Sequence, residues 1–159
     1  MKFGGKNIMI WGCMNWEVIG FVCRIEGRMN GELYEEILKD KLMNSLDWYG
    51  HNVENIIFQQ DNDPKHTCKR VQKWLDTQGI EVIQWPAQSP DLNPIEHLWF
   101  YLKKRVRDYK EPAGGVEELW ERTQVEWEKI SKEKCQGLIG SMPRRIAEVL
   151  KAKGGYTRY

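Results

Sequence analysis

Two acidic residues, Asp61 and Glu96, have types and positions that suit metal-dependent chemistry, and thirty-four residues separate them. Asp61 follows the apolar run at residues 56–58 and precedes turn residues. Glu96 comes just after Asn93 and Pro94, in the first turn of a predicted helix. Strand ends and helix starts open onto the edge of an α/β sheet, so the two carboxylates can converge on one pocket.

Paired carboxylates are the ligands that two-metal phosphoryl-transfer chemistry needs. Mg²⁺ is a hard ion that takes carboxylate and water oxygens. Two such ions about 3.5–4 Å apart activate the attacking oxygen and stabilise the leaving one. Carboxylates this close repel each other, so without metal at least one has a raised pKa. The pair alone also fits ordinary structural duties, because Asp is common in turns and Glu in a first helical turn complements the helix dipole.

The predicted helix that carries Glu96 has clear signals at its start. Asn93 is placed to cap it, and Pro94 takes its first position. Apolar residues then recur at i, i+3, i+4, i+7 and i+11, in Ile95, Leu98, Trp99, Leu102 and Val106. Glu96 lies about 100° round the helix from Ile95. It therefore stands at the edge of the apolar stripe, where it can face the rim of a sheet.

The other patterns predict alternating strands and helices. Strands are expected at residues 7–13, 18–25, 56–60 and 80–84, and helices at 30–48, from Pro64 to Gly79, at 116–130, and from Ser131 with a break at Gly140-Ser141. Asp63 is assigned to the turn and to capping the helix entered at Pro64, rather than to metal binding. After the break, Ile146, Val149 and Leu150 are expected to continue a buried face.

The segments around the two acids resemble the catalytic domain of Tc/mariner-family DNA transposases. QQDNDPKHT at residues 59–67 is similar to that family's second-acid motif, and SPDLNPIEHLW at residues 89–99 is similar to its third-acid motif. One branch of the family uses this thirty-four-residue spacing. The resemblance continues in IMIWGCM near the start and SMPRRIAEVLKAKGGYTRY at the end, so it covers essentially the whole chain.

The resemblance implies a three-acid site in which Asp61 and Glu96 are catalytic residues and ligands of Mg²⁺ or Mn²⁺. The family's first Asp lies on a strand upstream of the segment that here reads IMIWG, and nothing before Phe3 can carry it. The family's N-terminal helix-turn-helix DNA-binding region is missing too. We therefore expect the C-terminal two-thirds of a catalytic domain, inactive alone because two carboxylates do not replace three.

The fold implied by the resemblance is α/β, of the ribonuclease-H-like (retroviral-integrase-like) type, with a mixed sheet flanked by helices and lacking its first strand. Residues 1–110 form the core, and residues 111–159 form a C-terminal helical extension of the same domain. In the family the missing strand lies between those that here are residues 7–13 and 56–60. We expect a gap that closes up, distorts the sheet or receives a strand from another chain, because unpaired buried backbone groups cost about 1–3 kcal/mol each.

Basic residues are concentrated toward the C-terminus. Residues 1–100 carry 10 basic and 14 acidic side chains, net −4, whereas residues 101–159 carry 14 and 9, net +5. A Lys/Arg patch binds phosphates through counterion release, although a solvated helix face interleaved with Glu fits the charges as well. By resemblance, the residues assigned to DNA contacts are His66, His97, Lys103, Lys104, Arg105 and Arg107. Helix capping by His66 and plain solvent exposure of His97 are the alternatives.

The composition is that of a globular protein, with 159 residues of which 30% are charged and 41% hydrophobic. No apolar run approaches the ~18 residues of a membrane span, and the start of the chain does not resemble a signal peptide. The four cysteines form no C-x-x-C pair, which predicts free thiols in a reducing, intracellular setting. The resemblance implies a nuclear location.

Three hypotheses of function are consistent with the sequence. The first is a transposase catalytic domain that cleaves and joins DNA strands, with DNA and a second protein chain as partners. That second chain is either a homodimer partner or a chain that supplies the missing strand. The second hypothesis is a non-catalytic module that binds DNA or another partner, based on the basic C-terminal part. The third is a decayed fragment without a cellular role.

Overall fold

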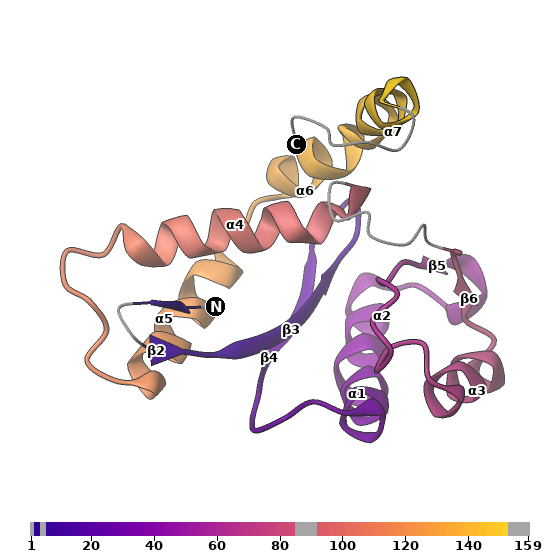
Figure 1. Ribbon diagram of the computed structural model, residues 1–159, viewed down its shortest axis with the longest axis horizontal. Coiled ribbons are helices and arrows are strands. Elements are labelled where there is room, and N and C mark those ends of the chain that lie inside the picture. The colour runs from indigo at the N-terminus through magenta and orange to yellow at the C-terminus, as the bar shows by residue number, and fades with distance from the viewer. Residues whose placement is uncertain (1, 4–5, 85–91, 153–159) are drawn as a thin grey trace.

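The computed structural model describes residues 2–3, 6–84 and 92–152. Its elements, in chain order, are β1 (Lys2–Phe3), β2 (Lys6–Asn7), β3 (Met9–Met14), β4 (Ile19–Ile25), α1 (Gly31–Ile37), a π-helical turn (Leu38–Leu42), α2 (Met43–Tyr49), a 3₁₀ turn (Val53–Asn55), β5 (Ile57–Phe58), α3 (Lys69–Gln78), β6 (Glu81–Val82), α4 (Pro94–Arg107), α5 (Val116–Glu128), α6 (Lys132–Gly140) and α7 (Met142–Lys151). Figure 1 shows β3 and β4 as a long hairpin, with α4 and α5 on one side and α1 to α3 on the other.

The hairpin of β3 and β4 is antiparallel, with Trp11 opposite Cys23. Its turn is held by Asn15, whose Oδ1 accepts hydrogen bonds from the backbone N–H groups of Glu17 and Val18, both at 2.8 Å. The two strands were predicted from the sequence, and the structure confirms them. All four cysteines are free thiols, as expected.

Both faces of the hairpin are covered by helices. Successive residues of a strand point to opposite faces. Ile10 and Met14 pack with α4, α5 and α6 in one core cluster, whereas Trp11 and Cys13 pack with α1, α2 and α3 in a second cluster. The hairpin is therefore the wall shared by two apolar cores.

The helix predicted from Asn30 to about Trp48 is present as a single helical run that includes the π-helical turn. Asn30 caps it, because its Oδ1 accepts a hydrogen bond from the backbone N–H of Leu33 at 2.9 Å. Gly50 ends it with a φ of 69°, in the left-handed region that favours glycine. The π-helical turn was not predicted.

The strands predicted at 56–60 and 80–84 form a parallel pair, but each is only two residues long. Ile57 lies opposite Glu81, and Phe58 lies opposite Val82. Among the described residues, this pair is not hydrogen-bonded to the β3–β4 hairpin or to the small β1–β2 pair. The expected gap in the sheet therefore does not close up, and the sheet is interrupted between β3 and β5.

Two expectations about helices are wrong. Helix α3 begins at Lys69 rather than at Pro64, so Asp63 does not cap it; instead, Asp63 Oδ1 accepts a hydrogen bond from the backbone N–H of Lys65 within a turn. In α7, Ile146 is 45% exposed and Leu150 is 72% exposed, whereas Arg145 is buried. The break between α6 and α7 does fall at Gly140 and Ser141, as predicted.

Helices α5 and α6 share the core of the hairpin and α4. Leu119 and Trp127 from α5 and Cys135 from α6 pack with Leu98 and Leu102 from α4. The proposed boundary between residues 1–110 and 111–159 stays a prediction. No helix in the part of the chain that the structure describes is long and apolar enough to cross a membrane.

Candidate metal centre

Asp61 lies in the loop that follows β5, and its carboxylate is held from two sides. Its Oδ1 lies 2.5 Å from Nδ1 of His66 and accepts a hydrogen bond from the backbone N–H of Asp63 at 3.1 Å. The carboxylate is half-exposed, with 51% of the side chain accessible, whereas the His66 side chain is only 15% exposed. The carboxylate is thus oriented by two contacts while remaining open to solvent.

Two glutamines connect the Asp61 loop to its surroundings. Gln60 Oε1 accepts a hydrogen bond from the Tyr34 hydroxyl at 2.7 Å, and Gln60 Nε2 donates to the His66 carbonyl at 3.2 Å. Gln59 Nε2 donates to Oδ1 of Asn93 at 3.3 Å, which joins the β5 strand to the start of α4. Asn93 precedes α4 as predicted, but its side chain makes this contact rather than a capping bond.

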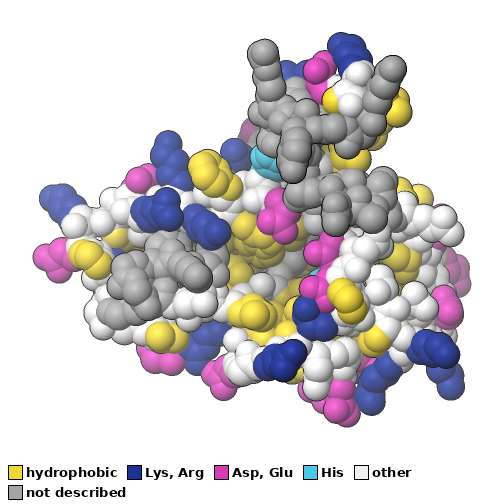
Figure 2. Space-filling model, in the orientation of Figure 1, with side chains coloured by type: hydrophobic (Ala, Val, Ile, Leu, Met, Phe, Trp, Pro, Cys, Tyr) yellow, Lys and Arg dark blue, Asp and Glu magenta, His cyan; other side chains and the backbone are white. Residues whose placement is uncertain are grey.

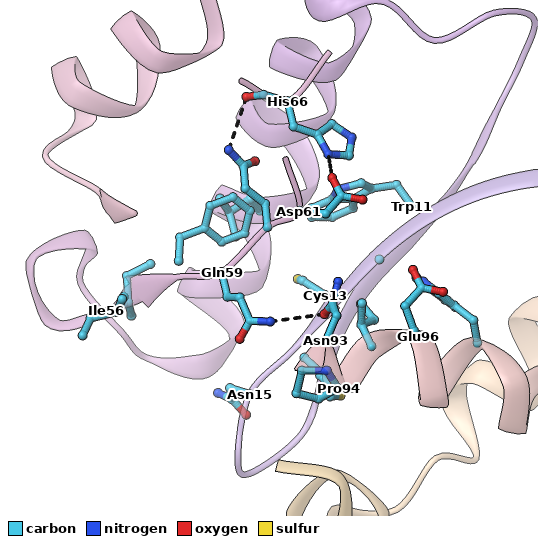
Figure 3. Close-up of a pocket in the computed structure, with 18 of the residues that line it drawn as sticks. Trp11, Cys13, Asn15, Ile56, Gln59, Asp61, His66, Asn93, Pro94 and Glu96 are labelled. Carbon is cyan, nitrogen blue, oxygen red and sulfur yellow. Dashed lines mark hydrogen bonds and ion pairs between the residues drawn. The ribbon is translucent and has the colours of Figure 1, made fainter. Parts of the chain in front are cut away.

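Glu96 stands in the first turn of α4, as predicted, with Pro94 at the helix start. Burial raises the pKa of the Glu96 carboxyl above its usual value, the negative charge of Asp61 raises it further, and Lys103 opposes the shift. The contribution from Asp61 means that the two acids are within electrostatic reach of each other. Figure 3 shows both carboxylates at the same pocket, Asp61 carried by the loop after β5 and Glu96 by α4.

A groove of about 520 Å³ lies between β3 and the β5 segment. Its lining is largely apolar and includes Trp11, Tyr34, Phe58 and Trp99, and the two acids among the described lining residues are Asp61 and Glu96. Figure 2 shows acidic side chains at the rim of a hollow with hydrophobic side chains inside it. The groove occupies the interruption in the sheet.

The two carboxylates supply the oxygen ligands that a hard divalent cation prefers. Without a cation, their negative charges repel each other. Within residues 2–3, 6–84 and 92–152, no group of three or more His, Cys, Asp or Glu side chains is arranged to hold a metal ion. Asp91, part of the third-acid motif, lies outside the described residues. The described part of the chain therefore brings together a pair of candidate ligands and not a complete set.

The basic residues assigned to DNA differ in position around α4. At 100° per residue, Lys103 and Arg107 lie within about 20° of the Glu96 face, whereas Arg105 is on the opposite side. Arg105 Nε donates to Oε2 of the buried Glu126 at 2.9 Å, which ties α4 to α5. Lys104 and Arg107 are exposed, and Lys103 is half-buried. DNA contact by any of them stays a prediction, and Arg105 has a structural partner.

The two histidines assigned to DNA also occupy different environments. His66 stacks on Tyr34, with ring centroids 4.0 Å apart, and contacts Asp61 rather than capping a helix. His97 is half-buried beside Glu96 on α4. Their DNA contacts stay predictions as well. Tyr34, Gln59 and Gln60 were not identified from the sequence, although both glutamines belong to the QQDNDPKHT motif.

Comparisons with known proteins agree with the fold. Residues 4–130 match the family described as DDE superfamily endonuclease. The chain is 38% identical over 160 residues to the Tcb1 transposase of Caenorhabditis briggsae, and equally to the Tc1 transposase of Caenorhabditis elegans. All of the chain is covered in both comparisons but only 57% of each relative, so it spans little more than half the length of these relatives.

The structure is similar to that of the Mos1 transposase catalytic domain, with a TM-score of 0.84 at 22% identity, over 99% of this chain and 81% of that one. A likeness of this size confirms the predicted ribonuclease-H-like α/β fold. The match of residues 4–130 covers most of the chain. The chain therefore belongs to the family of DDE superfamily endonucleases, and the relatives it resembles include Tc transposases of nematodes.

Proposed function

We propose that this chain is part of the catalytic domain of a cut-and-paste DNA transposase, with Asp61 and Glu96 as ligands of Mg²⁺ or Mn²⁺. The observation that carries the proposal is the convergence of the two motif acids, from a strand end and a helix start, on one groove. Structures of the Mos1 catalytic domain with Mg and with Mn support this choice of metal. The substrate is DNA, at transposon ends.

In the proposed function, the acidic and the basic residues of the site have different roles. Asp61 and Glu96 supply oxygen ligands from two different elements, so their geometry depends on the contact between Gln59 and Asn93. When bound, divalent ions activate the attacking oxygen of water or a DNA 3′-OH and stabilise the leaving oxygen. Lys103 and Arg107, on the same side of α4 as Glu96, neutralise DNA phosphates. No covalent bond between protein and DNA is required.

The chain is inactive alone in this proposal, because the family pattern has three acids. The family's first acid would come with an extended strand between β3 and β5. Among the described residues, the edges of β3 and β5 that face each other have no strand partner. Such a strand would fill the groove and pair with backbone groups on both sides. An upstream in-frame coding segment or a second chain would supply it. Mos1 paired-end complexes support DNA and a second protein chain as partners. The proposed action on DNA supports a nuclear location.

Calorimetry of Mn²⁺ binding tests the proposal, with circular dichroism to establish that each variant is folded. We expect the wild type to bind Mn²⁺, and Asp61→Asn and Glu96→Gln to lose binding because each removes a charged ligand. The matched control is Asp76→Asn, an exposed acid on α3 outside the groove, which should bind like the wild type. A folded wild type that binds no Mn²⁺ would overturn the metal-ligand assignment.

The second candidate function is a non-catalytic DNA-binding module. The face of α4 that carries Glu96 also carries Lys103 and Arg107 at helical spacing, which favours this candidate. Phe100 lies on the same face and is 71% exposed. DNA affinity that falls steeply with salt, in a protein that binds no Mn²⁺, would support this module over the enzyme. A decayed fragment would show neither activity.

A further inference from the structure

A closed set of contacts surrounds Asp61 and begins at a buried tyrosine of α1. Tyr34 is 1% exposed, and its hydroxyl donates to Gln60 Oε1 at 2.7 Å. The amide of Gln60 then donates to the backbone carbonyl of His66 at 3.2 Å. The His66 ring returns to stack on Tyr34, at 4.0 Å between centroids and 29° between planes. The loop that carries Asp61 is thus tied to Tyr34 of α1 at two points, and the bond between Gln60 and His66 closes the loop on itself.

His66 connects these contacts to the carboxylate of Asp61. Its Nδ1 lies 2.5 Å from Asp61 Oδ1, the same oxygen that accepts from the Asp63 backbone N–H. Among the described residues, both of these contacts fall on Oδ1, which leaves Oδ2 as the oxygen for a ligand in the groove. Figure 3 shows the His66 ring beside Asp61.

The other nitrogen of the ring indicates where the hydrogen lies. His66 Nε2 is buried and has no hydrogen-bond partner among the described residues. A hydrogen on Nε2 would be a buried donor without an acceptor, whereas a hydrogen on Nδ1 is accepted by Asp61. The geometry therefore favours the tautomer that has its hydrogen on Nδ1.

We propose that His66, held by Tyr34 and Gln60, is a positioning residue that fixes Asp61 for metal binding, rather than a residue that contacts DNA. The proposal rests on the proposed function of Asp61 as a metal ligand. Groups that orient a ligating carboxylate by a hydrogen bond commonly change metal affinity by about 10–100-fold when they are removed. Here the contact also fixes which carboxylate oxygen faces the groove.

Two substitutions of similar polarity separate positioning from general packing. In His66→Asn the amide nitrogen occupies the place of Nδ1 and can still donate to Asp61, whereas in His66→Gln it occupies the place of Nε2. Both lose the imidazole ring that stacks on Tyr34. We expect His66→Gln to bind Mn²⁺ about 10–100-fold more weakly than the wild type, and His66→Asn to retain most of the affinity.

The role of Tyr34 is tested with a hydroxyl deletion that keeps its ring. Tyr34→Phe removes the bond to Gln60 and leaves the stacking surface, so we expect a loss of Mn²⁺ affinity of about two- to tenfold. Tyr109→Phe is the matched control, because its hydroxyl donates to Glu126 at 3.2 Å, between α4 and α5 and away from the groove. It should leave the affinity unchanged.

A measurement without metal distinguishes this proposal from the proposed function. Nitrogen-15 NMR of the imidazole should show the hydrogen of His66 on Nδ1 in the wild type, and its redistribution in Asp61→Asn. A wild type that binds no Mn²⁺ but has this tautomer would refute the metal function and support the contact with Asp61. Equal Mn²⁺ affinities of His66→Asn and His66→Gln, or a wild-type hydrogen on Nε2, would overturn the positioning role.

Discussion

Asp61 and Glu96 differ in how their negative charges are compensated at the groove. Asp61 accepts a backbone N–H and contacts the His66 ring, so its negative charge has partners. Glu96 has its pKa raised by burial and by Asp61. Bringing the two acids together therefore destabilises mainly the ionised form of Glu96. A bound cation would remove this destabilisation.

This asymmetry predicts a small gain in stability for Glu96→Gln without metal. A raised folded-state pKa means that the folded wild type holds the proton more tightly than the unfolded chain. The wild type therefore loses stability as the pH rises from the usual value of 4.5 through the raised value. We expect the variant to unfold with a free energy up to about 0.5 kcal/mol higher at pH 7, and to match the wild type near pH 4. Urea titrations at the two pH values measure the difference.

The control for this prediction is Glu128→Gln, which neutralises an exposed acid on α5. It should show no comparable dependence on pH. High salt should reduce the gain of Glu96→Gln, since screening weakens repulsion between exposed carboxylates. A gain already present at pH 4 would contradict the electrostatic explanation.

The sequence predicted Asp61 and Glu96 as candidate ligands but not the residues that contact them. Both acids follow from local signals, because the end of an apolar run and an Asn-Pro helix start can be recognised within a few residues. Tyr34 and Gln60 are 26 residues apart, and their hydrogen bond depends on how α1 packs against the loop. No local pattern carries that information.

The hairpin of β3 and β4 tolerates little added volume at Gly20. A Cβ atom there would lie 2.5 Å from the Tyr49 hydroxyl and 2.6 Å from both the Cys13 sulfur and the Ser45 hydroxyl. Ser45 also accepts a hydrogen bond from the backbone N–H of Phe21 at 2.9 Å. The strand and α2 therefore approach each other only because this residue has no side chain.

Two glycine substitutions should change stability in opposite directions. Gly20→Ala forces α2 away from β4 and should lower the free energy of unfolding by about 1–3 kcal/mol. Gly137→Ala lies on the exposed side of α6 with no atom within 4 Å of the new Cβ, and should raise it by about 0.5–1 kcal/mol. Urea unfolding of both variants checks the prediction. A stable Gly20→Ala would mean that β4 and α2 are not held at this spacing.

At the scale of elements, sequence periodicity located the helices better than the short strands. The apolar stripe of α4 was predicted residue by residue. In the structure, Leu98, Leu102 and Val106 of this stripe pack in one core cluster. Strand β5 is shorter than predicted because a strand needs partners on its sides, and among the described residues only β6 pairs with it. The apolar positions Ile146 and Leu150 fit a buried face by spacing, but no described element covers them.

The whole molecule depends on its C-terminal helices for one of its two cores. Trp127 of α5 is 2% exposed and donates through Nε1 to the carbonyl of Gly20 at 2.8 Å. Leu119, Ile130 and Leu138 join it in the cluster around α4. Large apolar side chains contribute about 1.5–3 kcal/mol each when buried, so these four together rival the ~5–15 kcal/mol of a whole domain.

We therefore expect residues 1–110, produced alone, not to fold cooperatively. Circular dichroism in the near ultraviolet should lose its fixed side-chain signal, and urea should give no sharp transition. A chain of residues 1–152 is the control, since it keeps every described element. Cooperative unfolding of the shorter chain would instead make residues 111–159 a separable extension.

The paired indoles at the centre of this arrangement also give the protein an optical signal. Trp99 of α4 and Trp127 of α5 stack with ring centroids 5.3 Å apart and 24° between planes, and both contact the space beside Gly12 of β3. Two indoles this close share their electronic excitations, which splits their ultraviolet absorption into a pair of circular-dichroism bands of opposite sign. Those bands report the meeting of β3 with α4 and α5, so folding of this half of the molecule can be followed without an added label.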